Sequence, residues 1–155
     1  MTTTAADFKR DPLRDELRAL YAEVDALLSP FSCASTTECC DFGLTGREPY
    51  PTAIELAEID FAMRTSPQKK RLPMAATSSQ KGKCPLLSAE GRCRIYASRP
   101  FGCRTFFCER ITPDGAKLPR KEIQRLSRAV ADLSARFGAA NARDPGPRPL
   151  TRALK

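Results

Sequence analysis

Hydrophobic residues recur at three- and four-residue steps along three stretches of the chain, and each stretch is expected to form an amphipathic helix. The first stretch follows Asp11 and Pro12, which suit the N-cap and the first position of a helix, and Pro30 is expected to end it. We expect its stripe to pack in the core and the helix to deliver the chain to Cys33. The stripe consists of Leu13, Leu17, Leu20, Tyr21, Val24, Leu27 and Leu28.

The second stretch covers about residues 52–64, where Thr52 and Glu55 have the spacing of a capping box. Its apolar positions are Ile54, Leu56, Ile59, Phe61 and Met63. The third stretch covers about residues 119–137 and is expected to stop at Gly138. Its stripe consists of Ile123, Leu126, Val130, Leu133 and Phe137. The pattern therefore predicts a mainly α fold: one small domain of about three helices with little β structure.

The remaining stretches read as connectors and ends. Residues 41–51, DFGLTGREPYP, contain two Gly and two Pro, which indicates a loop. Residues 65–83 contain no acidic residue and little periodicity, so we expect a mobile connector there. Residues 1–10 are expected to be flexible, and residues 141–155 to be a disordered, basic, Pro-rich tail. The folded domain is thus predicted to span residues 11–140.

Four of the seven cysteines lie in one short segment, CPLLSAEGRCRIYASRPFGCRTFFC, at Cys84, Cys93, Cys103 and Cys108. Gly91 suits a tight turn between the first two, and residues 93–96 could form a short strand of a small hairpin. The other three cysteines lie upstream in CASTTECC, at Cys33, Cys39 and Cys40. Because CASTTECC is polar, metal ligation explains its thiols better than burial as small hydrophobic side chains.

The chain contains no His, which excludes Cys–His nucleophile pairs, Ser–His–Asp triads and imidazole metal sites. Any metal must therefore be held by thiolates, and all-sulfur ligation selects zinc, Cu(I) or an iron–sulfur cluster over magnesium or calcium. The cysteine spacings match neither zinc ribbons nor ferredoxins, so they leave open which four thiols bind one ion. The order of preference is Cys33, Cys40, Cys93 and Cys103, followed by Cys84, Cys39 and Cys108.

The formal charge of +8 is compatible with a nucleic-acid or other acidic partner, but no long basic tract supports one. Arg94, Arg99 and Arg104 lie beside the cysteines in sequence. Such cations would stabilise an anionic thiolate centre and lower thiol pKa values, although a solvated face or a phosphate contact explains them equally well. The apolar shell of the site is expected to consist of Ile95, Tyr96, Phe101, Phe106 and Phe107.

Neither a membrane span nor a secretory signal is indicated. No apolar run approaches the roughly 18 residues that cross a bilayer, and the first ten residues lack an apolar core. We therefore expect a reducing cytoplasm, where stable disulfides are uncommon, and the odd number of cysteines agrees with this. The sequence does not indicate an oligomeric state.

CASTTECC and CPLL…GRCRIYASRPFGCR together resemble the CxxCxxCC cysteine-cluster family, the YkgJ-like zinc- or iron-chelating domain. The first half of the family pattern is matched by Cys33, Cys39 and Cys40. The second half is matched by Cys84, Cys93, Arg99, Pro100, Cys103 and Arg104. The resemblance covers residues 33–108 and implies metal chelation, without a settled substrate or reaction. Where the family pattern has its second cysteine this chain has Thr36, and Cys108 is a candidate replacement.

Three functions are compatible with these observations. The first is a metal-binding protein that holds zinc or an iron–sulfur centre through cysteine thiolates. The second is a component of a methyl-transfer or redox enzyme, because the same cluster domain resembles part of flagellin lysine N-methylases. However, the chain is shorter than those enzymes and lacks both a glycine-rich cofactor loop and a C-x3-C-x2-C run. The third is a metal- or redox-sensing regulatory module with a basic surface for nucleic acid. The sequence favours the first, which is not enzymatic.

Overall fold

The computed structural model describes residues 5–31, 37–66, 82–106 and 117–155 of the chain. Its helices are α1 (Ala5–Lys9), α2 (Pro12–Leu27), α3 (Phe42–Thr45), α4 (Ala53–Thr65), α5 (Phe101–Arg104), α6 (Arg120–Asn141) and α7 (Leu150–Ala153). Two 3-10 turns, Glu38–Cys40 and Tyr96–Ser98, complete the element order. In these ranges, β pairing is limited to two isolated bridges. The expected small, mainly α fold is confirmed, but the short strand at 93–96 is not formed.

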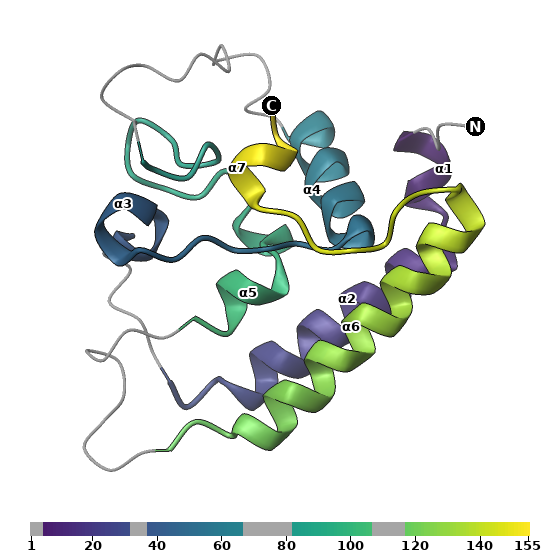
Figure 1. Ribbon diagram of the computed structural model, residues 1–155, viewed down its shortest axis with the longest axis horizontal. Helices are drawn as coiled ribbons and strands as arrows, with labels where there is room; N and C mark the ends of the chain where they lie inside the picture. The colour runs from purple at the N-terminus through teal and green to yellow at the C-terminus, as the bar shows by residue number, and fades with distance from the viewer. Residues whose placement is uncertain (1–4, 32–36, 67–81, 107–116) are drawn as a thin grey trace.

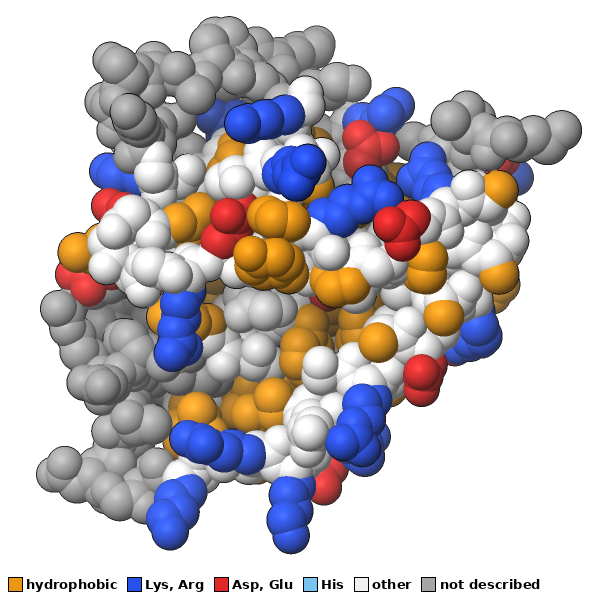
Figure 2. All heavy atoms as spheres, in the orientation of Figure 1, with side chains coloured by type: hydrophobic (Ala, Val, Ile, Leu, Met, Phe, Trp, Pro, Cys, Tyr) orange, Lys and Arg blue, Asp and Glu red, His pale blue; other side chains and the backbone are white. Residues whose placement is uncertain are grey.

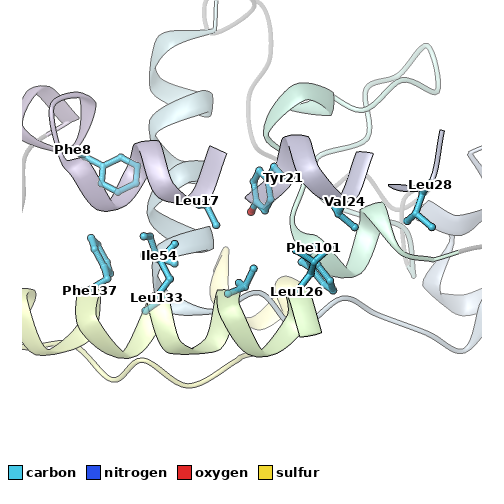
Figure 3. Packing of buried hydrophobic residues seen from close by; sticks show 12 residues of the cluster. Phe8, Leu17, Tyr21, Val24, Leu28, Ile54, Phe101, Leu126, Leu133 and Phe137 are labelled. Atoms are coloured by element: carbon cyan, nitrogen blue, oxygen red, sulfur yellow. The ribbon is translucent and has the colours of Figure 1, made fainter. Parts of the chain in front are cut away.

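Three long helices build the main core. α2 and α6 lie side by side in opposite directions, and α4 packs against both of them (Figure 1). Figure 3 shows side chains of α2 facing those of α6, with Ile54 of α4 between them. The predicted stripes of α2 and α6 therefore form this core, together with Ile54 and Phe61 of α4. Its fully buried members include Leu17, Val24, Ile54, Leu126 and Phe137. The other predicted positions of α4, Leu56, Ile59 and Met63, pack in a second cluster.

The predicted helix starts are confirmed by their caps. The Asp11 carboxylate accepts the Leu13 N–H at 2.9 Å at the start of α2. At the start of α4, the Glu55 carboxylate accepts the Thr52 N–H at 2.8 Å and the Thr52 hydroxyl at 3.0 Å. These bonds satisfy polar groups that a helix terminus otherwise leaves without partners.

The end of α6 differs from the prediction, because the helix continues through Gly138 and ends after Asn141. Ala142, in a left-handed conformation with φ 50°, closes it. A Cβ atom at position 138 would lie 2.7 Å from the carbonyl oxygen of Arg143 and 3.0 Å from Pro145 Cβ. Glycine is needed there because the following segment crosses directly over the helix, so Gly138 allows close approach instead of ending α6.

The last fifteen residues are not the disordered tail that was expected. The segment after α6 lies along residues 49–51: Arg148 N–H donates to the Pro51 carbonyl (3.1 Å) and Leu150 N–H to the Pro49 carbonyl (3.0 Å). The Leu150 side chain is only 1% exposed. Proline restricts this segment to extended conformations, which suits its antiparallel course beside residues 49–51. Burial of Leu150 anchors its C-terminal end.

Two other segments expected to be irregular also carry short helices. The N-terminal α1 buries Phe8 against Phe61 and Phe137, whose ring centroids lie 6.2 and 5.8 Å away. Within 41–51, α3 forms one turn, because the Asp41 carboxylate caps it at Leu44 N–H (3.0 Å) and Gly46 ends it with φ 63°. Most of the expected connector, residues 67–81, lies outside the described residues. Across the described ranges, no helix is both long and apolar enough to cross a membrane.

Candidate metal centre

Main-chain pairing brings the Cys39–Cys40 turn and Cys84 together. Cys84 N–H donates to the Cys40 carbonyl at 2.7 Å, and Asp41 and Lys83 form an antiparallel bridge beside it. Two residues further on, Gly43 N–H donates to the Gly82 carbonyl at 3.0 Å. Residues about forty positions apart in sequence are therefore fixed next to each other at the backbone.

A tight turn then carries the chain from Cys84 to Cys93. Leu87 and Cys93 form the second isolated bridge, and Gly91 stands at the tip with φ 72°. Ser88 N–H donates to the Arg92 carbonyl at 2.8 Å, and Arg94 N–H donates to the Leu86 carbonyl at 3.0 Å. The turn predicted at Gly91 is confirmed, and it is a single bridged turn, not a hairpin with regular strands.

Cys103 is placed by α5. Pro100 precedes this helix, and Cys103 N–H donates to its carbonyl at 2.9 Å. Phe101, the first residue of α5, is buried in the main core and anchors the turn there. Cys103 is therefore tied to the packing between α2 and α6, although its own segment is short.

Five thiols line one open hollow of about 1940 Å³ in the described part of the molecule. They belong to Cys39, Cys40, Cys84, Cys93 and Cys103, and all five are free. Figure 2 shows one face of the molecule hollowed between the C-terminal segment and α6, with hydrophobic side chains on the floor. The structure thus brings together five of the seven predicted ligands; Cys33 and Cys108, like Thr36, lie outside the description.

The five thiols are close enough to influence one another electrostatically. The pKa of Cys103 is raised by burial and then by the charges of Cys84, Cys93 and Cys39. The pKa of Cys40 is raised by its hydrogen bond with Cys39, by burial, and then by the charges of Cys39, Cys84 and Cys93. However, within the described ranges no group of three or more Cys, Asp or Glu side chains is placed so that it could hold a metal ion. The donor chemistry fits a soft metal, and the arrangement around one ion stays a prediction.

Burial and hydrogen bonding set the protonation of these thiols. Burial raises the pKa of Cys84 to about 11 and, together with the neighbouring thiolates, that of Cys103 to about 12. Burial likewise raises the pKa of Cys93. The pKa of Cys39 is lowered to about 6, because the Cys40 thiol donates a hydrogen bond to it, and the pKa of Cys40 is raised in return. Without a bound cation, the buried thiols are therefore protonated at neutral pH.

The three nearby arginines have different surroundings. The charge of Arg99 partly offsets the effect of burial on the pKa values of Cys93 and Cys103, and it adds to the effect of the Cys40 hydrogen bond on the pKa of Cys39. Arg104 is buried; it pairs with Asp25 and donates to backbone carbonyls. The buried Nε of Arg94 has no hydrogen-bond partner among the described residues.

The predicted apolar shell is partly correct. Ile95 and Phe101 are buried, whereas Tyr96 is 63% exposed and lies under the Arg99 guanidinium, 4.0 Å from the ring centroid. Phe106 contacts Arg47 in the same way, at 5.5 Å. Phe107 lies outside the described residues. Tyr96 thus packs against the Arg99 guanidinium at the surface and is not part of a buried apolar shell.

Sequence reasoning missed Glu58 and Ser98, and it assigned Glu55 only to helix capping. Both glutamates are buried and accept hydrogen bonds from the segment between Cys93 and Cys103. The sequence contained a signal for these residues. Glu55 and Glu58 are three residues apart, so they share a face of a helix that is otherwise rich in apolar residues, and this pattern indicates carboxylates that lie in the interior.

Comparison with known proteins identifies the family. Residues 32–130 match a family model described as "CxxCxxCC: Putative zinc- or iron-chelating domain". The match covers more than half of the chain, so the chain belongs to this family, which is the YkgJ-like family that its motifs resemble. No curated protein and no solved structure matches the chain. The family description supports a metal-binding role, with zinc or iron as the metal.

Proposed function

We propose that this member of the zinc- or iron-chelating family holds a zinc ion or an iron–sulfur centre through cysteine thiolates. The observation that carries the proposal is the convergence of five free thiols, from three separate chain segments, on one hollow in a protein without His. Thiolates without imidazole are the donor set that zinc and iron–sulfur centres use and that magnesium and calcium avoid.

The protonation of the thiols determines what a metal must displace when it binds. Burial holds Cys84 and Cys103 protonated at neutral pH, and the neighbouring thiolates add repulsion. A bound metal cation would supply the positive charge that replaces these protons. Binding is therefore expected to release protons and to remove the repulsion between the thiolates. The proposed ligands are chosen from Cys33, Cys39, Cys40, Cys84, Cys93, Cys103 and Cys108, in the order of preference inferred from the sequence.

The surroundings of the thiols support a stabilising or regulatory site. The buried side chains beneath the bridged turn form a second core, made of Ile59, Cys84, Leu86, Leu87, Ile95 and Leu150. A core of this size contributes little stability by itself, and metal ligation commonly supplies the remainder in small domains. A metal joining Cys39–Cys40, Cys84–Cys93 and Cys103 would cross-link a 3-10 turn, the bridged turn at Gly91 and the one-turn helix α5, which are all short.

Metal analysis of protein purified without oxygen, together with its visible spectrum, tests this proposal. Zinc in a colourless protein would establish a zinc site, whereas iron with acid-labile sulfide and a broad band at about 400 nm would establish an iron–sulfur centre. Substitution of Cys93 or Cys103 by Ser should remove most of the metal. A folded protein that contains and binds neither metal would contradict the proposal.

A further inference from the structure

The segment between Cys93 and Cys103 is fastened to α4 by two buried carboxylates. Ser98, in the 3-10 turn Tyr96–Ser98, donates its hydroxyl to Glu58 Oε1 at 2.9 Å. The Phe101 N–H, on the other side of Pro100, donates to Glu55 Oε1 at 2.7 Å. Glu55 is 2% exposed and Glu58 is fully buried. One face of α4 thus holds this segment at two points, each between Cys93 and Cys103.

Arg104 holds the same segment from its other side. Its guanidinium donates to the Ala97 carbonyl at 2.6 Å and to the Arg99 carbonyl at 2.9 Å. It also pairs with Asp25 of α2 and lies over the Tyr21 ring, 4.0 Å from the centroid. The Tyr21 hydroxyl donates to Glu55 Oε1 at 3.1 Å, which joins the two sets of contacts. The segment is therefore held by side chains from both α2 and α4.

Helix packing does not require these buried charges. Apolar side chains already pack α2, α4 and α6 together. Glu58 is held by Arg14 at 2.6 Å and Arg18 at 3.1 Å, but buried ion pairs are often no more stabilising than apolar side chains of similar volume. An apolar side chain could not accept hydrogen bonds from the Ser98 hydroxyl and the Phe101 N–H. In the described ranges, the segment that contains these two donors is not paired with a β-strand. The buried carboxylates thus give this segment a defined position.

We propose that Glu55 and Glu58 are positioning residues of the cysteine centre. They fix residues 96–104 to the long helices, so that Cys93 and Cys103 are held in place before a metal binds. The inference rests on the proposed metal-binding function and adds to it the residues that act through the ligands. Because the segment is ordered in advance, metal binding does not have to supply the free energy of ordering it.

Replacement of Ser98 by Ala tests this most cleanly, because Glu58 keeps both of its arginine partners. The matched control is Ser134→Ala in α6: Ser134 is also buried, and its hydroxyl donates to the Pro145 carbonyl at 3.0 Å, away from the cysteines. Zinc affinity is measured by competition with a chelator, Co²⁺ spectra report the ligand field, and thermal unfolding of the metal-free protein reports stability. We expect Ser98→Ala to weaken zinc binding about tenfold, within the range for groups that orient ligands. Ser134→Ala should retain wild-type affinity even if its unfolding temperature falls.

Hydrogen exchange of the metal-free wild-type protein provides a second test that needs no substitution. The Phe101 amide should exchange slowly without metal, at a rate closer to amides of α6 than to exposed amides. Wild-type affinity in Ser98→Ala, equal losses in both variants, or protection of Phe101 only after metal is added would each overturn the positioning role. If the wild-type protein binds neither zinc nor cobalt and contains no iron–sulfur centre, the proposed function itself fails, and that result is distinct from these three.

Discussion

The charge of Arg99 influences the pKa values of three of the described thiols. Its guanidinium lies over the Tyr96 ring, donates to the Tyr96 carbonyl at 3.2 Å, and stands 3.7 Å from Asp25. From there its charge opposes the rise that burial causes in the pKa values of Cys93 and Cys103. It also adds to the lowering of the Cys39 pKa, which is caused mainly by the hydrogen bond from Cys40. Thiols must lose their protons to bind a metal, so this cation favours the binding-competent state.

Replacement of Arg99 by Gln should weaken zinc binding at pH 7 by about three- to tenfold, because the pKa values of three thiols rise. Chelator competition measures the change. Arg92→Gln is the matched control: Arg92 directly precedes Cys93, is exposed, and carries the same charge. An equal loss in both variants would show that net charge, and not the position of Arg99, controls binding.

Among the five described thiols, Cys39 should be the most reactive in the metal-free protein at neutral pH. Its pKa of about 6 leaves it mostly as thiolate at pH 7, whereas Cys103, with a pKa of about 12, stays protonated. The rate of alkylation of Cys39 by iodoacetamide, followed by peptide mass spectrometry, should rise through pH 6 and level off above about pH 7. Cys40→Ala removes the thiol donor and should shift this profile to higher pH. A Cys39 rate that still rises tenfold per pH unit at pH 8 would contradict the assignment.

At the scale of single residues, the sequence identified the chemistry but not its orientation. The absence of His and the clustering of cysteines were sufficient to predict a thiolate site. From the sequence alone, Arg94, Arg99 and Arg104 were equally good candidates for a cation near the thiols. Proximity in sequence does not show where a guanidinium points. Arg104 packs onto Tyr21 of α2, which is distant in sequence. Arg99 packs onto Tyr96 because the 3-10 turn between them brings the two side chains together.

Among the elements, α6 shows most clearly how packing overrides local preference. Alanine favours an isolated helix over glycine by about 1 kcal/mol. Nevertheless, Gly138→Ala should lower the free energy of unfolding by about 1–3 kcal/mol, because its Cβ would press on Arg143 and Pro145. Urea unfolding measures this change. Gly43→Ala is the control, because the nearest atom to its Cβ is Asp41 Oδ1 at 3.4 Å, an ordinary contact. A Gly138→Ala variant as stable as the wild type would mean that the segment does not cross α6 closely.

The long elements could be predicted and the short ones could not. α2, α4 and α6 each carry an apolar stripe several turns long, and the starts of α2 and α4 have capping residues. α3, α5 and the two 3-10 turns contain only three or four residues each, too few for a period to be detected. They form because of local caps and tertiary contacts. The bridged turn at Gly91 was predictable because glycine signals it directly.

For the whole molecule, the C-terminal segment connects the helices to the cysteine region. Leu150 joins the second core together with Cys84, Leu86 and Ile95. The sequence did not show this, because a Pro-rich basic composition is typical of disorder and a single Leu carries no periodicity. Five of the predicted ligands line one hollow. Their arrangement around one ion stays a prediction, because the sequence spacing of cysteines does not determine the distances between their thiols.

Leu150→Ala should therefore destabilise the protein by about 2–5 kcal/mol, the usual range for a fully buried leucine. Thermal or urea unfolding of the metal-free protein checks this. Leu44→Ala, at a side chain that is 67% exposed, should change stability little. If Leu150→Ala behaved like Leu44→Ala, the last fifteen residues would not be part of the folded unit.

X-ray absorption at the metal edge of protein purified without oxygen tests the central claim most directly, because it reports the atoms bound to the metal. The account predicts a first shell made of sulfur, with zinc–sulfur distances of about 2.3 Å if the metal is zinc. In an iron–sulfur centre, the shell would again be sulfur, with iron neighbours beyond it. A shell dominated by oxygen or nitrogen would contradict the claim that the cysteine thiolates hold the metal.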